Sequence, residues 1–252
     1  MRDGNEDRFI IREDGGLVLM AVADGVGGGP GGEIAAEAAV NELAGRFFAA
    51  PRTQPIAERL GDAMREANTA VLKAAEASSK PSAATTLVAG VVDGRSLVIA
   101  NLGDSRAYLV RDGASRQITE DHAGTVEHGI TRFVGDSRGV QADVFMEELQ
   151  ASDRLVLCSD GLTRHVEPAE IASTLAANPG TLEAGADALV ALANSRGGED
   201  NVTVVLYGVG KNARLSDRQR GTLALGIFVA FVVLVVVGAF AVLFSVAPYA
   251  SP

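Results

Sequence analysis

Five short segments of the chain place an aspartate beside a glycine or an asparagine, at one end of an apolar run: MRDGNED, VADGVGGG, NLGDSR, CSDG and GGEDN. A single segment of this kind is an ordinary turn, because Gly, Asp and Asn suit chain reversals. Five of them suggest that the carboxylates meet in space, where they repel one another unless protons or cations neutralise them. Clustered carboxylate oxygens are the hard ligands that Mg²⁺ and Mn²⁺ prefer. The pattern therefore indicates a divalent metal centre.

The candidate ligands lie at the ends of predicted strands. They are Glu6 and Asp7 before strand 8–12, Asp24 after strand 17–23, Asp104 between strands 96–101 and 106–111, Asp160 after strand 154–158 and Asp200 before strand 201–209. Strand ends on one edge of a pair of sheets can converge. The chain has no HExxH motif, no Cys/His cluster and no Walker A loop, so zinc hydrolysis and nucleotide phosphate binding lack support.

The rest of the first 209 residues supplies the elements that must position these side chains. Apolar runs predict two further strands, at 85–92 and 143–149, and apolar residues at helical spacing predict helices at 33–49, 55–77, 168–177 and 182–195. Most strands follow one another through short turns. This order predicts an α+β fold with antiparallel sheets and helices packed outside them, rather than a doubly wound parallel sheet.

Charge is distributed unevenly along the chain. The net charge is −10, but residues 211–220 carry +3 and residues 221–252 carry none, so residues 1–210 carry −13. A body this acidic repels phosphate backbones, which excludes nucleic acid as a partner. Cys158 is the only cysteine, so no disulfide forms within the chain. It ends an apolar strand, and we interpret it as a core thiol.

The C-terminal region predicts a membrane anchor. Residues 223–247 contain no charge, and as a helix they would span roughly 37 Å, enough to cross a hydrocarbon core of about 30 Å. We assign 210–221 as a basic linker, 222–247 as a transmembrane helix and 248–252 as an external tail. The basic cluster before the helix keeps the acidic body in the cytoplasm by the positive-inside rule. The expected location is the inner or plasma membrane, crossed once, with the C-terminus outside.

An ordered series of motifs resembles that of the bacterial PPM-type, or type 2C, metal-dependent serine/threonine protein phosphatases. The series is R-x-x-N-E-D from Arg2, A-D-G-V-G-G at 23–28, G-D-S-R at 103–106, S-D-G-L at 159–162 and D-N-V-T at 200–203, with a D-H pair at 121–122 and ITRFVGD at 130–136. It covers about residues 1–209. The resemblance implies a four-layer α-β-β-α sandwich with the active site at one edge of two mainly antiparallel sheets.

The resemblance also implies roles for the candidate residues. Two Mn²⁺ or Mg²⁺ ions would activate a water that hydrolyses phosphoserine or phosphothreonine in cytoplasmic proteins, opposing a Ser/Thr kinase. By this resemblance, Asp24 would bridge the ions, the Gly25 carbonyl would bind one of them, and Asp160 and Asp200 would hold the other. Glu6 and Asp7 would order metal-bound waters, and Asp104 would match a third metal position with Asp160. Arg2 would bind the substrate phosphate.

The chain departs from the family pattern at three places. Val26 stands where eukaryotic relatives carry a histidine that can act as general acid, which leaves His122 and His128 as conceivable donors, although a structural role is the better interpretation for both. Only AGTVEHG separates His122 from Ile130, too short for the usual helical flap, so we expect a shortened or absent flap and an open site. Arg2 is the second residue of the sequence, and chain ends are often poorly ordered, so its assignment to phosphate binding is the least secure.

Two other functions remain open from the sequence. One is a PPM-fold scaffold at the membrane with weak or lost activity, which the short flap and start favour and the retained aspartates oppose. The other is a two-metal phosphoesterase that acts on small molecules.

Overall fold

The computed structural model describes residues 4–26, 30–80, 82–124 and 129–210. The chain divides into two units, Met1–Ala213 and Arg214–Pro252, of which the second lies wholly outside the described residues. The predictions for Arg2, His128, the transmembrane helix 222–247 and the tail 248–252 therefore fall outside them, and the linker is described only at Gly210. Among the described residues, none of the helices has both the length and the apolar character needed to cross a bilayer.

The first sheet contains six strands that pair antiparallel. Its order is β1-β2-β4-β5-β8, and the short β3 pairs with the end of β2. The strands are β1 Asp7–Asp14, β2 Leu17–Val26, β3 Ala84–Thr85, β4 Leu87–Asp93, β5 Ser96–Leu102 and β8 Asp143–Glu148.

The second sheet has four strands in the order β10-β9-β6-β7, again antiparallel. The strands are β6 Arg106–Arg111, β7 Ala114–Gln117, β9 Arg154–Cys158 and β10 Val204–Gly208. Both sheets are joined by the tight turn between β5 and β6, which carries the G-D-S-R motif from one sheet to the other.

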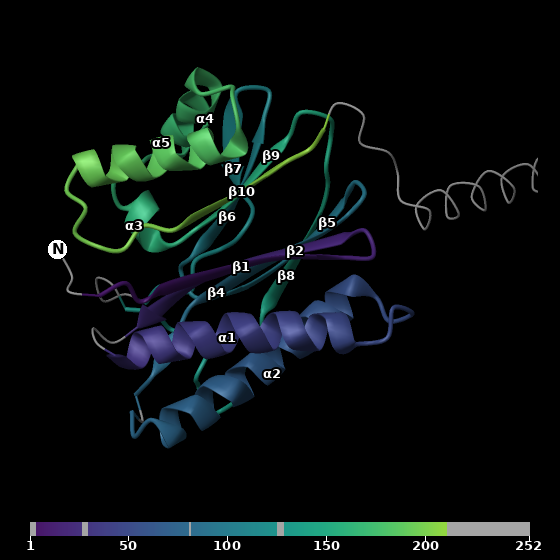
Figure 1. Cartoon of the computed structure of the whole chain (residues 1–252), viewed down its shortest axis with the longest axis vertical. Helices are drawn as coiled ribbons and strands as arrows, with labels where there is room; N and C mark the ends of the chain where they lie inside the picture. The colour runs from purple at the N-terminus through teal and green to yellow at the C-terminus, as the bar shows by residue number, and fades with distance from the viewer. Residues whose placement is uncertain (1–3, 27–29, 81, 125–128, 211–252) are drawn as a thin grey trace, which may run out of the picture. The chain divides into compact units, whose positions relative to one another are not determined.

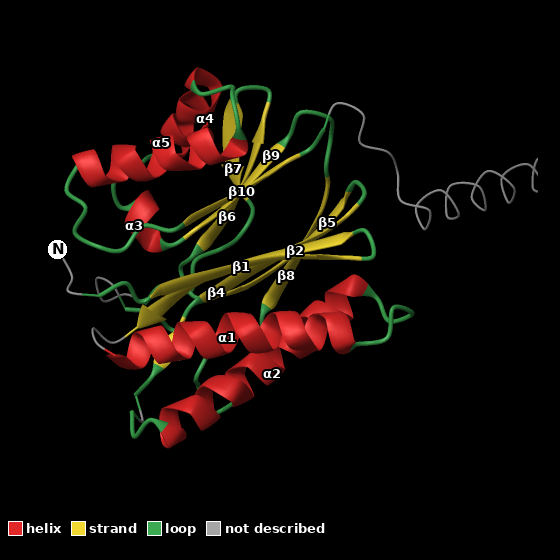
Figure 2. Ribbon diagram, in the orientation of Figure 1, coloured by secondary structure: helices red, strands yellow, loops and turns green. Residues whose placement is uncertain are grey.

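Helices cover the outer faces of both sheets (Figures 1 and 2). Helices α1 Pro30–Ala49 and α2 Ile56–Ala77 pack on the first sheet, and α4 Pro168–Ala177 and α5 Leu182–Ser195 pack on the second. A four-residue helix, α3 Asp160–Thr163, follows β9 directly. The arrangement confirms the prediction of two antiparallel sheets with helices outside.

Three apolar cores hold these layers together. One lies between α1, α2 and the first sheet, a second lies between the two sheets, and a third lies between the second sheet and α4 and α5. Alternate residues of β2 serve different cores: Leu19 and Ala21 face the helices, whereas Met20 and Val22 face the other sheet. Strands buried on both faces explain why the sequence shows continuous apolar runs here rather than alternation.

Most element boundaries follow the sequence-based expectation. The bounds of α4 and α5 match it fully, because both helices begin with capping groups: Glu167 and Glu170 form a capping box, and Thr181 accepts from the Ala184 amide. Strand β2 runs to Val26, so Asp24 lies within the strand rather than after it. The extra length comes from pairing with β3, a contact far apart in the sequence.

The segment between β7 and β8 contains no helix in its described part, residues 118–124 and 129–142. Residues Ala123 and Ile130 form a β-bridge, and Val134 exchanges two backbone hydrogen bonds with Thr85. The described residues therefore show a short connection in place of the helical flap usual in the family that the motifs resemble.

Asn68 of α2 forms hydrogen bonds to the backbone of this segment. Its buried side chain accepts from the amides of Gly135 (2.6 Å) and Asp136 (2.9 Å) and donates to the Asp136 carbonyl (3.0 Å). One side chain thus satisfies three backbone groups of a segment that has no regular structure of its own.

We predict that Asn68→Ala lowers the free energy of unfolding by about 2–4 kcal/mol, because it leaves these backbone groups without partners. Urea unfolding followed by circular dichroism measures the loss. Thr69→Ala, an exposed change on the next residue of the same helix, is the matched control. A loss no larger than that of the control would show that the segment does not depend on Asn68.

Candidate metal centre

Strand pairing brings acidic residues from distant segments to one edge of the two sheets. Asp7 and Asp24 are direct partners in the β1–β2 register, and side chains paired in this way lie on the same face about 5 Å apart. Asp24 shares the strand face of Met20 and Val22, so it points between the sheets. Asp160 follows Cys158, whose partners Arg106 and Val204 keep the ends of β6, β9 and β10 together.

Ser159 connects the two sheets at this edge. Its hydroxyl donates to Asp7 Oδ2 (2.7 Å) and accepts from the Thr203 amide (3.0 Å), and its own amide donates to the Thr203 carbonyl (3.1 Å). The Glu6 amide donates to Asn201 Oδ1 (2.9 Å) in a second bond between the sheets. These neutral partners hold Glu6 and Asp7 against the S-D-G and D-N motifs.

Thr86 performs a similar function on the other side of Asp24. The Asp24 amide donates to Thr86 Oγ1 (3.0 Å), and the Thr86 amide donates to the Asp24 carbonyl (2.9 Å). The Thr86 hydroxyl also hydrogen-bonds with that of Ser105 (2.7 Å), beside Asp104. Sequence reasoning missed Ser159, Asn201, Thr86 and Ser105, although three of them stand inside the quoted motifs.

Gly25 in the A-D-G-V-G-G motif and Gly32 just after it lie where backbone segments approach closely. A Cβ on Gly25 would overlap the backbone of Gly32, and a Cβ on Gly32 would overlap the Glu6 carboxylate. A Cβ on Gly161 would in turn overlap the Asn201 carbonyl. The first turn of α1 and the S-D-G turn can therefore lie against the acidic cluster only because these residues lack side chains.

Burial and mutual repulsion change the acidity of the cluster. Burial, followed by the charges of Asp7, Asp160 and Asp200, raises the pKa of Asp24 well above its usual range. Burial also raises the pKa of Asp7, although the Ser159 hydroxyl opposes this shift. The pKa of Asp104 rises to about 6, through burial and the charge of Asp160. Asp7, Asp160 and Asp200 therefore lie close enough to Asp24 to raise its pKa, and Asp160 also lies close to Asp104.

The donor atoms fit a divalent metal. Among the described residues, four buried carboxylate oxygens have no hydrogen-bond partner: Glu6 Oε2, Asp7 Oδ1, Asp104 Oδ1 and Asp160 Oδ1. Buried polar atoms without partners are costly and uncommon, and carboxylate oxygens left free in a cluster are suited to hard cations. In the positions they adopt, no three acidic, histidine or cysteine side chains of the described residues already surround a single point as ligands.

A guanidinium group lies against the cluster instead. Arg164 Nε is 3.0 Å from Asp160 Oδ2, Nη2 contacts the same oxygen, and Nη1 is 3.4 Å from Asp200 Oδ2. Sequence reasoning overlooked this cation. Its signal was the spacing of four residues from Asp160, which brings two side chains together when the intervening residues are helical.

His122 has a structural position. The Gly103 amide donates to His122 Nδ1 (3.0 Å), so Nε2 carries the proton and donates to Asp143 Oδ2 (2.8 Å). The ring is buried and both nitrogens are engaged, which favours the structural interpretation over a general acid. Cys158 is fully buried, and burial raises its pKa to about 12, which agrees with a core thiol.

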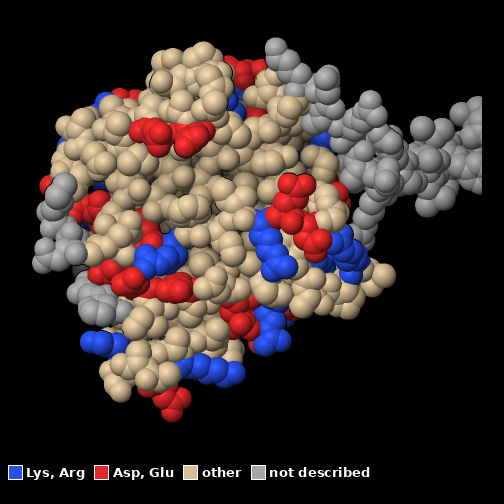
Figure 3. Space-filling view, viewed as in Figure 1, with Lys and Arg blue, Asp and Glu red and all other residues tan. Residues whose placement is uncertain are grey.

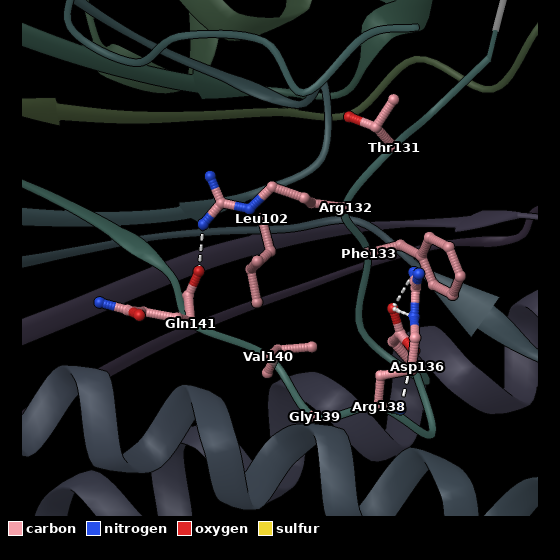
Figure 4. Close-up of a pocket in the computed structure, with 9 residues that line it drawn as sticks. All are labelled: Leu102, Thr131, Arg132, Phe133, Asp136, Arg138, Gly139, Val140 and Gln141. Atoms are coloured by element: carbon pink, nitrogen blue, oxygen red, sulfur yellow. Dashed lines mark hydrogen bonds and ion pairs between the residues drawn. The ribbon is translucent and has the colours of Figure 1, made fainter.

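A separate hollow of about 220 Å³ lies beside the segment 131–141 and contains none of the candidate ligands. Figure 4 shows its arginines turned toward acceptors of the same segment. Arg132 bonds to the Gln141 carbonyl and to Asp143, and Arg138 pairs with Asp136 (2.7 Å). Both arginines therefore already have oxygen partners within or next to this segment.

Comparison with known proteins matches this arrangement to one family. A model described as protein phosphatase 2C matches residues 3–193. The serine/threonine phosphatase stp of Listeria innocua is 36% identical over 229 residues, which cover 82% of this chain and 90% of the relative. The serine/threonine protein phosphatase PstP of Mycobacterium tuberculosis is 34% identical over 236 residues, which cover 80% of this chain and 45% of PstP.

Solved structures show the same similarity. The S. agalactiae serine/threonine phosphatase superposes with a TM-score of 0.75 at 28% identity, over 82% of this chain and 94% of that one. The catalytic domain of PstP in complex with two manganese ions superposes with a TM-score of 0.71 at 33% identity, over 83% and 94% of the two chains.

The raised pKa of Asp104 predicts a pH dependence for the chelated protein. The folded chain holds this proton up to about pH 6, whereas an unfolded Asp releases it near pH 3.9, so the contribution to stability is full below about pH 4 and is lost as pH rises through 6. Solvent screening of this partly exposed group limits its contribution to the free energy of unfolding to about 1–2 kcal/mol. Thermal melts in chelator between pH 4.5 and 7.5 should show a smaller rise in stability at low pH for Asp104→Asn than for the wild type, because the raised pKa values of Asp7 and Asp24 still contribute in the variant. Parallel pH profiles for the two proteins would contradict the assignment.

Proposed function

The chain belongs to the protein phosphatase 2C family and is a protein-serine/threonine phosphatase dependent on Mn²⁺ or Mg²⁺; from this premise we propose which residues carry the reaction and where in the cell it occurs. The observation that supports the proposal most strongly is the set of buried carboxylate oxygens without partners at the edge of the two sheets. We propose Asp24, the Gly25 carbonyl, Asp160 and Asp200 as the ligands of two ions. Asp104 completes a third position with Asp160.

When bound, the two ions supply an activated water and neutralise charge on the phosphoryl group. Asp7 and Glu6 would order waters of the bound ions, and Ser159 and Asn201 hold those two residues in place. Arg2 binds the substrate phosphate through its fork of donors. No residue of the chain needs to form a covalent phosphate, which agrees with a buried, inert Cys158.

The substrates we propose are phosphoserine and phosphothreonine in cytoplasmic proteins. Such substrates require an enzyme that adds phosphate to hydroxyl side chains, so this phosphatase opposes a Ser/Thr kinase. Nucleic acid is disfavoured by the net charge of −13 on residues 1–210. On the face shown in Figure 3, acidic and basic side chains alternate in small groups and form no continuous basic field.

A membrane location completes the proposal. It is supported by the uncharged residues 223–247 and by the basic residues before them. The catalytic unit would then act on proteins at the cytoplasmic face of the inner or plasma membrane. The alternative is a membrane-bound PPM-fold scaffold with weak or lost activity, which the short connection between His122 and Ile130 favours.

We predict that Asp24→Asn lowers Mn²⁺-dependent hydrolysis of para-nitrophenyl phosphate and of a phosphothreonine peptide by about 10³-fold, because the ions would lose a negatively charged ligand. Asp112→Asn, the same change in the exposed β6–β7 turn, should leave the rate unchanged. Melting of the chelated Asp24→Asn protein should be no lower than that of the wild type, because a buried like charge has been removed. Absence of hydrolysis by the wild type with any divalent ion would support the scaffold.

The membrane proposal predicts that the full chain sediments with membranes and is released by detergent but not by 1 M salt. A chain that ends at Gly210 should remain in the soluble fraction. A chain that ends at Gly221 retains the basic linker and is the matched control, since it tests attraction to anionic lipid without insertion. Full-length protein that salt alone releases would contradict a transmembrane anchor.

A further inference from the structure

Arg164 forms ion pairs with both Asp160 and Asp200. It stands at the C-cap of α3, the four-residue helix that begins with Asp160 itself. The guanidinium directs Nε and Nη2 at Asp160 and Nη1 at Asp200, so one planar group spans both carboxylates. The fork geometry of arginine suits this contact better than a lysine ammonium would.

The negative charges of Asp160 and Asp200 explain why a cation lies beside them. The Asp160 and Asp200 side chains are 15% and 4% exposed, and both lie beside the buried Asp24. Like charges in this position repel unless a positive group intervenes. Arg8, another cation near the cluster, is turned toward the carbonyls of Asn5 and Asp7 and toward Glu33, away from this pair.

We propose that Arg164 is a built-in counter-ion of the metal centre, which neutralises Asp160 and Asp200 in the metal-free protein and competes with the divalent cation for them. This inference rests on the proposed function, in which the same two carboxylates hold one ion. A metal that binds both must displace the guanidinium and lose the energy of two ion pairs. Arg164 therefore sets a higher metal concentration for loading than the carboxylates alone would require.

The position of Arg164 permits this exchange. Its side chain is 33% exposed, so the guanidinium can turn into solvent without opening an apolar core. Its backbone hydrogen bond, from the Arg164 amide to the Asp160 carbonyl, does not depend on the side chain. The exchange therefore needs only a rotamer change at the surface, a motion of picoseconds to nanoseconds for exposed side chains.

Isothermal titration of Mn²⁺ into the chelator-treated, dialysed full chain in detergent micelles tests the inference. Arg164→Gln should bind Mn²⁺ about three- to tenfold more tightly than the wild type, the range expected for loss of partly exposed ion pairs. Arg164→Lys keeps the charge but loses the fork, and its affinity should lie between the two. Arg46→Gln removes the same charge near the far end of α1, roughly 21 Å from the Gly32 turn, and should bind as the wild type does.

The outcomes separate this inference from the function on which it rests. Absence of Mn²⁺ uptake by the wild type and all variants would overturn the metal centre itself. Uptake by the wild type with equal or weaker affinity in Arg164→Gln would overturn only the role of Arg164. If Arg164→Gln fails to show a cooperative melt, Arg164→Lys decides: an affinity no tighter than that of the wild type contradicts the inference.

Discussion

Repulsion among buried carboxylates is the constraint on which the site depends. Burial and the charges of Asp7, Asp160 and Asp200 raise the pKa of Asp24, and burial also raises the pKa of Asp7, because a charged form is unfavourable away from water. A fold that holds such a cluster must supply rigid support from elsewhere. Here the support comes from neutral groups, chiefly Ser159 and Thr86, which fix the carboxylates without cancelling the charge that a metal would use. The three apolar cores provide the rigid frame for these contacts.

The cluster lies at an edge where the two sheets meet. The β1–β2 register aligns Asp7 with Asp24, while β6, β9 and β10 end together on the other sheet. Glycines complete the junction, since side chains at Gly25, Gly32 or Gly161 would push the backbones apart. The G-D-S-R turn crosses from one sheet to the other at this same edge. Each short motif is therefore a contact between segments distant in sequence.

The sequence predicted the layers well and their junctions less well. Periodic apolar runs located the long elements, and the structure shows capping groups at the predicted starts of α4 and α5. Strand β7 was missed because it has only four residues, three of them polar, which alternate between exposed and half-buried. Helix α3 was missed because a helix of one turn has no periodicity. Asp24 was placed after its strand because the pairing of β2 with β3 is non-local. The motifs located the acidic cluster, but the metal role of each residue stays a prediction, as do Arg2 and the membrane helix outside the described residues.

Charge also links metal loading to substrate binding. A phosphate group carries the same sign as the cluster and as the −13 body around it, so the metal-free site repels its own substrate. The guanidinium of Arg164 reduces that repulsion by a single charge and is already shared between two carboxylates. The carboxylate cluster therefore attracts a phosphate only after divalent cations have neutralised it. The described part of the connection between His122 and Asp143 contains no helix, and we expect the charge of the cluster to influence entry of the substrate.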